Sequence, residues 1–213
     1  MTTLIKKATL QLILTLFFSQ FLIFAQDIKL PEPQKTGGMP LMEALNKRSS
    51  TRNYSKEEIS SQFLSNMLWA AYGFNRPKEK MRTVPSAWNI QNINIYVAKS
   101  EGLYLYDASD NILKLVLKKD IRKNTGSQSF VKDVPVNLIY VADLSMMSRV
   151  GNKARFYSAA HTGFISQNVY LFCASVNLGT VIRDLIDRDK LRKIMDLKDN
   201  QEIILAQSVG YIK

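Results

Sequence analysis

The sequence predicts one α+β domain in which helices flank a mixed, mainly antiparallel sheet. The chain has 213 residues, of which 46% are hydrophobic, and this length and composition suit a single domain with a sizeable core. Apolar residues recur at helical spacing in some segments and alternate with polar residues in others. A short polar turn, residues 107–111, separates two of the strand-like segments and predicts a hairpin.

The strand signals follow one another along the middle and the end of the chain. Ile93, Ile95 and Val97 alternate with more polar residues, which is typical of a half-buried strand. Residues 136–142 are almost continuously apolar, which indicates a central strand buried on both faces. The other expected strands are residues 103–106 and 112–117 on either side of the hairpin turn, 180–182 and 203–211.

Helix signals lie between these strands. Ser55 and Glu58 fit a capping box, which predicts Ser55 as the N-cap of a helix over residues 59–71, and Gly73 stands where a C-cap is expected. Gly179 is expected to close a long helix over residues 156–176. Shorter helices are expected over residues 41–48 and 187–195.

The first 25 residues are expected to be a signal peptide. Lys6 and Lys7 precede an apolar run that ends at Ala25, and this order is typical of a secretory signal. An uncleaved membrane anchor is the alternative. Residues 26–40 carry three prolines and a Gly-Gly pair and are interpreted as a linker, so the folded domain is expected over residues 41–213. We therefore expect an exported protein with no membrane contact after cleavage.

Composition excludes several kinds of site. One cysteine excludes a disulfide within the chain, and one cysteine and one histidine exclude a metal centre built from several such ligands. Cys173 is interpreted as inert core and His161 as a packing or surface residue. The net charge of +11 favours anionic partners. The basic residues are scattered without an aromatic platform, so nucleic acid is not an expected partner.

A basic, hydroxyl-rich segment follows the first expected helix. In an extended chain alternate side chains share a face, so Arg48, Ser50 and Arg52 are expected to point the same way. Two guanidinium groups beside a hydroxyl form a suitable cradle for a phosphate or ribityl group, because arginine donates in bidentate geometry. A solvated basic loop is the alternative interpretation.

A second candidate segment, residues 82–91, leads into the strand that contains Ile93. Its proline and small residues would let a flat ligand approach the backbone, and Asn89 and Gln91 offer donors and acceptors to a heterocycle. An ordinary polar loop explains the same residues. The third candidate segment, residues 178–183, follows the long helix and would present backbone N–H groups.

Together these segments resemble the nitroreductase-like FMN-dependent oxidoreductases. The sequence Arg-Ser-Ser-Thr-Arg-Asn-Tyr at residues 48–54 is similar to the opening flavin motif of that family, and Pro-Ser-Ala-x-Asn-x-Gln at residues 85–91 to its second motif. Residues 163–181 resemble its long helix and third motif, and residues 209–211 its closing strand. The order of the motifs, over residues 41–213, carries the resemblance.

The resemblance implies a homodimer with FMN in two sites at the subunit interface. Within the first motif Arg52 is also the candidate cation near flavin N1 and O2. By analogy the first motif binds the FMN phosphate, ribityl chain and pyrimidine edge. The second motif of the partner subunit lines the isoalloxazine, and the backbone after the long helix approaches flavin N5. The implied cofactor-binding residues are Arg48, Ser49, Ser50 and Arg52, then Pro85, Ser86, Ala87 and Asn89, then Ile182, Arg183 and Asp184.

Two departures from the family pattern affect these expectations. Asp184 stands where family members often have glycine, and Lys213 is the remaining candidate for a closing basic contact with the phosphate. The implied activity is ping-pong hydride transfer through N5 between a small-molecule donor and acceptor, with no catalytic side chain required. NAD(P)H fits the family but conflicts with export, and the second and third motifs lean toward the azoline-dehydrogenase-like branch. A non-catalytic flavin-binding or interaction protein with the same fold is the alternative.

Overall fold

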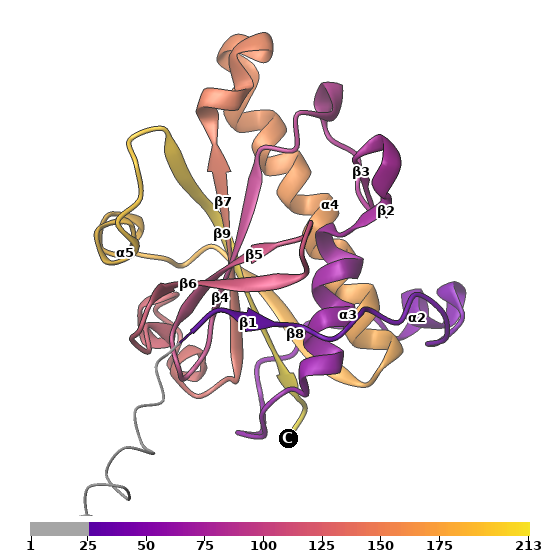
Figure 1. Cartoon of the computed structure of the whole chain (residues 1–213). Coiled ribbons are helices and arrows are strands. Elements are labelled where there is room, and N and C mark those ends of the chain that lie inside the picture. Colours follow the sequence, from indigo (N-terminus) through magenta and orange to yellow (C-terminus); the bar gives the residue numbers. More distant parts are fainter. Residues whose placement is uncertain (1–25) are drawn as a thin grey trace, which may run out of the picture.

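A computed structural model describes residues 26–213, and the expected signal peptide lies outside the described residues. Its main feature is a seven-stranded sheet in the order β1-β6-β5-β4-β7-β9-β8, in which every neighbouring pair is antiparallel (Figure 1). The expected α+β class is confirmed. The strands of this sheet are β1 (Ile28–Lys29), β4 (Ile93–Ala98), β5 (Leu103–Asp107), β6 (Ile112–Leu117), β7 (Val136–Asp143), β8 (Leu178–Arg183) and β9 (Gln201–Tyr211).

Helices cover both faces of the sheet. The long helix α4 (Ala154–Ser175) and α3 (Ser61–Tyr72) pack on one face, α5 (Arg188–Met195) packs on the other, and α2 (Leu41–Lys47) packs against α4. A separate two-stranded ribbon pairs β2 (Phe74–Arg76) with β3 (Met81–Arg82). The short 3₁₀ helices are η1 (Pro77–Glu79), η2 (Ala87–Asn89), η3 (Arg122–Asn124), η4 (Ser129–Lys132) and η5 (Leu144–Lys153).

The central strand β7 divides its side chains between two cores. Leu138 and Tyr140 belong to the larger core beneath α3 and α4, whereas Ile139 and Val141 belong to the smaller core beneath α5. Successive side chains of a strand point to opposite faces, so both faces of this strand are covered. The apolar run in the sequence therefore indicated the middle of the sheet correctly.

The segment interpreted as a linker is instead part of the domain. Ile28 and Lys29 pair with β6 and add an edge strand to the sheet, and Leu30 is buried. The Pro31 carbonyl oxygen accepts hydrogen bonds from Ser65 and from Asn111. Because prolines suit edge strands as well as loops, composition alone did not distinguish the two cases.

The capping box at Ser55 is also corrected. The helix α3 begins later, and its N-cap is Ser60, whose hydroxyl accepts the Phe63 N–H at 3.2 Å. Ser55 accepts the N–H of Glu57, two residues on, and so closes a local turn instead. Gly73 is the C-cap, as expected, with its N–H bonded to the carbonyl of Trp69.

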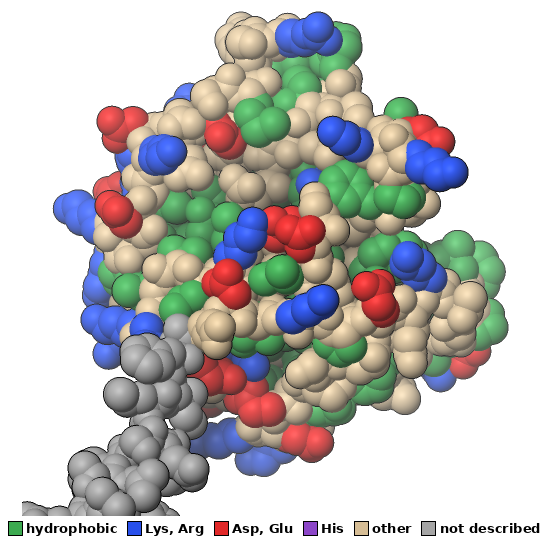
Figure 2. All heavy atoms as spheres, viewed as in Figure 1, with side chains coloured by type: hydrophobic (Ala, Val, Ile, Leu, Met, Phe, Trp, Pro, Cys, Tyr) green, Lys and Arg blue, Asp and Glu red, His purple; other side chains and the backbone are tan. Residues whose placement is uncertain are grey.

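Several large apolar side chains remain exposed. Figure 2 shows hydrophobic side chains on the projecting α2 at the right-hand edge, where Leu41, Met42 and Leu45 are exposed. Phe156 and Phe164 are exposed on α4. Within residues 26–213 no helix is both long and apolar enough to cross a bilayer.

Candidate functional site: a basic segment beside the edge strand

The first predicted motif lies beside β8, which is the last strand of the sheet. The N–H of Thr51 donates to the carbonyl oxygen of Thr180 at 2.9 Å, and Tyr54 forms an isolated antiparallel bridge with Ile212. Gly179 permits this approach, since an added Cβ would lie 3.0 Å from side-chain atoms of both Thr51 and Ile212. Gly179 is therefore a strand residue at a close contact, and not the end of the long helix as expected.

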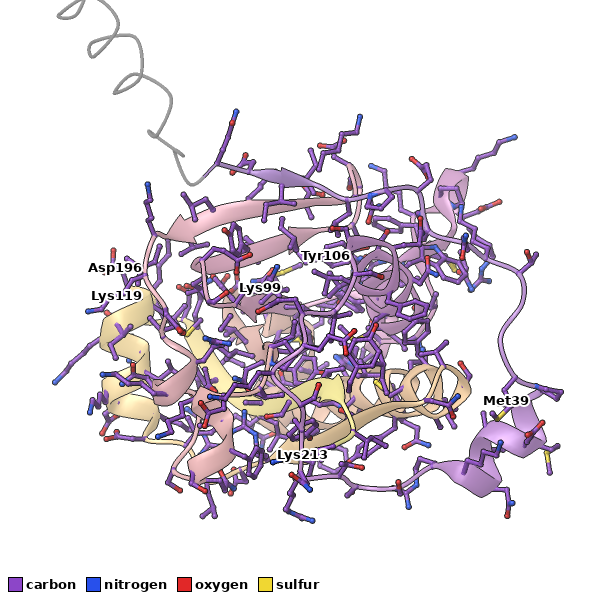
Figure 3. All side chains as sticks on the ribbon, turned by 90° about the horizontal axis from the view of Figure 1, so that it is seen from below. Met39, Lys99, Tyr106, Lys119, Asp196 and Lys213 are labelled. Carbon is purple, nitrogen blue, oxygen red and sulfur yellow. The ribbon has the colours of Figure 1, made fainter. Side chains whose placement is uncertain are left out.

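The last residue of the chain lies beside the same segment. The Lys213 N–H donates to the Asn53 carbonyl at 3.3 Å. Figure 3 shows Lys213 at the edge of the molecule along which the chain passes after α2. The first motif, the third motif and the closing strand therefore meet in one place, although they are far apart in the sequence.

Tyr170, on α4, joins the first motif to β8. Its hydroxyl bonds to Ser50 Oγ at 2.9 Å and accepts the Ile182 N–H at 3.0 Å, and the Arg48 guanidinium lies 5.4 Å from the centre of its ring. Sequence analysis placed Tyr170 in a motif but gave it no role. The available signal was a hydroxyl-bearing residue on the buried, apolar face of a long helix.

The side chains of the first motif are available to a ligand. Arg48 and Ser50 lie on the same side, as the alternation predicts, because both contact Tyr170. Arg48 and Arg52 are exposed, and neither forms an ion pair within residues 26–213. Free guanidinium groups of this kind suit an anionic group with several acceptor oxygens.

A cavity of about 240 Å³ opens between these segments. Its wall includes Cys173, which is buried, and burial raises the pKa of its thiol well above the usual range. The thiol is therefore protonated and unreactive, as expected for a core cysteine. The residues that line the cavity are Lys47, Ser49, Tyr170, Cys173, Ala174, Asn177, Leu178, Thr180 and Ile212.

The register of β8 decides which backbone groups face outward. The Ile182 N–H points away from the sheet, toward Tyr170, and Ile182 lies opposite Gln207 of β9. Residues of an antiparallel pair alternate between bonded and non-bonded positions, so Arg183, opposite Ala206, is bonded across to β9. The Ile182 N–H therefore lies at the outer edge of the sheet, where it donates to the Tyr170 hydroxyl, whereas the Arg183 N–H faces β9.

The Arg183 side chain is likewise directed into the protein, so the expected approach to flavin N5 concerns the backbone of this segment alone. It is 4% exposed, and its guanidinium donates to Ser208 Oγ at 3.0 Å, to the Thr125 carbonyl at 2.8 Å and to Asn137 Oδ1 at 2.9 Å. Burial without a carboxylate partner lowers the pKa of Arg183 to about 10. Its role is to satisfy buried oxygen atoms.

Asp184 follows β8 at the surface. Its carboxylate pairs with the Arg188 guanidinium at 2.5 Å, at the start of α5. The position that is often glycine in the family is thus occupied by a carboxylate held by the next helix. The negative charge of Asp184 is neutralised locally.

The second predicted motif lies at the other half of α4. Pro85 and Asn89 are exposed, and Ser86 and Ala87 are partly buried. The Ala87 N–H donates to His161 Nε2 at 2.8 Å. A second cavity of about 300 Å³ is lined by Asn75, Arg76, Met81, Arg82, Thr83, Val84, Pro85, Ser86 and Asn89.

Gln91 does not offer its amide to a ligand, contrary to expectation. Its Oε1 accepts from Arg82 Nε at 2.7 Å, and its Nε2 donates to the Lys80 carbonyl at 2.6 Å and to Asn89 Oδ1 at 2.8 Å. Arg82 is itself placed over the rings of Tyr72 and Phe74, at 4.0 and 4.2 Å from their centroids. Arg82 and Gln91 therefore support the conformation of the loop and are not free to bind a ligand.

The first and second motifs do not meet within one chain. The first motif and β8 contact Tyr170 of α4, whereas the second motif contacts His161. Nine residues of helix separate these positions by roughly 13 Å along the axis, at about 1.5 Å per residue. The two predicted motifs of one chain therefore lie at different positions along α4.

Comparisons with known proteins identify the family. The Nitroreductase family matches residues 45–211. A crystal structure from Ralstonia eutropha JMP134, assigned to a nitroreductase, shares 40% identity and a TM-score of 0.84 over 88% of this chain and 90% of that chain. A Methanocaldococcus jannaschii protein named as a nitroreductase is 29% identical over 81% of this chain and 91% of its own length. An NADPH:FMN oxidoreductase of Vibrio harveyi, solved with NAD⁺, shares the fold at 14% identity, with a TM-score of 0.61 over 81% of this chain and 69% of that one.

The fold and the family match define this chain as an oxidoreductase of the nitroreductase type. The match covers most of the chain and includes all three motifs. The protein belongs to the nitroreductase family.

Proposed function

We propose that this protein is an FMN-dependent oxidoreductase in which two chains complete each flavin site. The observation that carries the proposal is the pair of exposed, unpaired guanidinium groups, Arg48 and Arg52, beside the outward N–H of the edge strand β8. The V. harveyi relative is named for FMN and NADPH and supports both the cofactor and a nicotinamide donor.

The residues of the first motif fit a phosphate-bearing cofactor. Arg48 and Arg52 would hold the phosphate in bidentate hydrogen bonds, and Lys213, whose backbone is tied to this segment, would add a third cation. The Ser49 and Ser50 hydroxyl groups suit a polyhydroxyl chain.

The edge of β8 fits the other end of the cofactor. FMN supplies hydride transfer through N5, so the protein needs no acid–base side chain for that step. The Ile182 N–H, which donates to the Tyr170 hydroxyl in this structure, would hold an acceptor atom of the cofactor once that hydroxyl moves aside. The chain contributes orientation, positive charge and exclusion of water.

We propose two chains per site from the family resemblance and from exposed apolar side chains that a second copy would cover. A second copy would cover the exposed apolar face of α4, which includes Phe156 and Phe164, and the exposed apolar residues of α2. In a two-fold dimer each patch meets its own copy, so antiparallel α4 helices would bring Tyr170 of one chain toward the second motif of the other. Pro85, Ser86, Ala87 and Asn89 would then face the flavin ring.

The proposed reaction cycle is ping-pong, with a small-molecule electron donor followed by a small-molecule acceptor at the same site. NAD(P)H is the donor that the family suggests. It conflicts with the export that we propose from residues 1–25, and an exported protein would require another donor. On the basis of the second and third motifs, we propose that the protein is similar to the azoline-dehydrogenase-like branch of the family.

The test is FMN binding by the purified protein and by Arg48→Ala and Arg52→Ala. Each lost guanidinium should remove charge-assisted hydrogen bonds of about 1.5–3 kcal/mol, so FMN should bind about 10- to 100-fold more weakly. Arg149→Ala is the matched control, because Arg149 is exposed on η5, at the opposite end of α4 from Tyr170 and the first motif.

The loaded protein is then titrated without oxygen with NADH and NADPH. Bleaching of the flavin absorption followed by recovery with a nitro or quinone acceptor supports an enzyme. Unchanged FMN affinity in both arginine variants would refute the cradle. A protein that binds FMN and is reduced by no donor would favour the non-catalytic alternative.

A further inference from the structure

The loop of the second motif has an unusual backbone. Trp88, Asn89 and Gln91 have φ angles of 48°, 54° and 55°. Asparagine tolerates this left-handed region, but a bulky tryptophan is a genuine outlier there. A strained residue of this kind persists only when the surroundings hold it. Contacts outside the loop must therefore keep it in place.

His161 supplies one of these contacts, and the donors around it fix its protonation state. A backbone N–H can only donate, so His161 Nε2 must accept the Ala87 N–H at 2.8 Å. Its Nδ1 lies 2.8 Å from Asn92 Oδ1 and must carry the proton. Asn92 Nδ2 donates to Ser158 Oγ at 2.8 Å, and Ser158 Oγ donates to the Ala154 carbonyl at 2.8 Å. The chain of bonds is complete only for the neutral imidazole.

The surroundings of His161 also favour the neutral form. The side chain is 2% exposed, and burial lowers its pKa from the ordinary value of 6.5. Tyr157 is the titratable side chain whose ring lies next to the imidazole, at 6.3 Å between centroids. In the described part of the chain no charged side chain from the loop, from β4 or from α4 pairs with the imidazole. A proton on His161 would therefore have no counter-charge.

We propose that His161 is a positioning residue whose neutral imidazole locks the loop of residues 86–91, and whose protonation releases that loop. A protonated Nε2 carries its own hydrogen and faces the Ala87 N–H, so two donors would oppose each other. The loop would then leave its left-handed conformation. The consequence for flavin binding rests on the proposed function, because the same loop carries Ser86, Ala87 and Asn89.

The direction of the pH effect follows from the lowered pKa. Above the unfolded-state value of about 6.5 both states are neutral at this position, and the bonds of His161 contribute their full stability. Below that value the unfolded chain binds the proton first, and stability falls. The loop itself opens as the pH passes through the lower pKa of the folded state.

Trp88 provides a readout that needs neither flavin nor activity. The chain has two tryptophans, Trp69 and Trp88, so Trp69→Phe leaves Trp88 as the sole indole emitter. The Trp88 ring lies edge-on to Tyr157, 6.3 Å between centroids, and moves away if the loop opens. We expect a one-proton change in Trp88 emission. Its midpoint should lie below 6.5, which is the ordinary pKa of histidine.

Two variants make the result specific to His161. His161→Gln keeps an acceptor and a donor without titrating, so the transition should vanish while the neutral-pH emission stays. Asn92→Asp places a carboxylate beside Nδ1, which should raise the pKa of His161 and move the midpoint to higher pH. A transition that persists in His161→Gln, an unmoved midpoint in Asn92→Asp, or no transition in the parent protein would overturn the proposal.

FMN affinity over the same pH range separates this inference from the proposed function. A phosphate monoester itself titrates near about pH 6, so the comparison is between parent and His161→Gln. We expect extra weakening in acid in the parent alone. Identical pH profiles would overturn the role of the loop in flavin binding. A Trp88 transition in a protein that binds no FMN at any pH would support His161 as the lock and refute the proposed function.

Discussion

Arg183 shows how one residue can belong to a motif and still serve the core. Its guanidinium meets Ser208, Thr125 and Asn137 away from solvent. Arg183→Ala would leave these buried oxygen atoms without a donor and would leave a cavity. We expect the free energy of unfolding to fall by on the order of 3 kcal/mol, measured by urea denaturation.

Arg149→Ala is the control for that measurement. An exposed arginine without buried partners should change stability by no more than about 0.5 kcal/mol. The FMN affinity of folded Arg183→Ala should match that of the parent. Normal stability combined with lost FMN would return Arg183 to the cofactor site.

Individual roles were only partly readable from the sequence. The shared side of Arg48 and Ser50 followed from simple alternation, because the segment runs extended beside β8. The inward direction of Arg183 did not follow, because Thr180, Val181 and Ile182 give no polar contrast between the two faces of the strand. The occupied amide of Gln91 depends on Arg82 and Lys80, which reach it only after the β2–β3 ribbon forms.

The start of α3 gives a direct test of local structure. Ser60 caps the helix through the Phe63 N–H, whereas Ser55 accepts only within a surface turn. Ser60→Ala should lower the free energy of unfolding by about 1 kcal/mol, because a helix N–H loses its acceptor.

Ser55→Ala is the matched comparison, since it also removes a serine hydroxyl from the segment that precedes α3. Its expected effect is below about 0.5 kcal/mol, as for an ordinary surface position. Both values come from urea denaturation. A larger loss in Ser55→Ala than in Ser60→Ala would restore the capping box that the sequence favoured.

Most elements were predictable because their patterns are strong. The alternation in β4, the apolar run of β7 and the helical spacing of α4 each indicate one structure. β1 was missed because two residues among prolines carry no period, and their pairing depends on β6, distant in the sequence. Tertiary pairing, which local composition does not encode, decided that segment.

The distribution of motifs over the molecule could not be read from their order. Residues 48–54 and 178–183 meet because β8 is the edge strand, and residues 85–89 lie apart because they join the other half of α4. The family resemblance implies two subunits per site, and this remains part of the proposal. The structure shows that the two motifs of one chain contact α4 at different positions, Tyr170 and His161.

The central claim is that flavin binds only where two chains meet, and sedimentation velocity followed at the flavin absorption tests it most directly. Phe164→Glu places a charge on the exposed apolar face of α4, and Val116→Glu makes the same change on β6 as a control. The parent and Val116→Glu should carry their flavin at the dimer position, and Phe164→Glu should sediment as a monomer with no flavin. Flavin that sediments with monomeric Phe164→Glu would contradict the account.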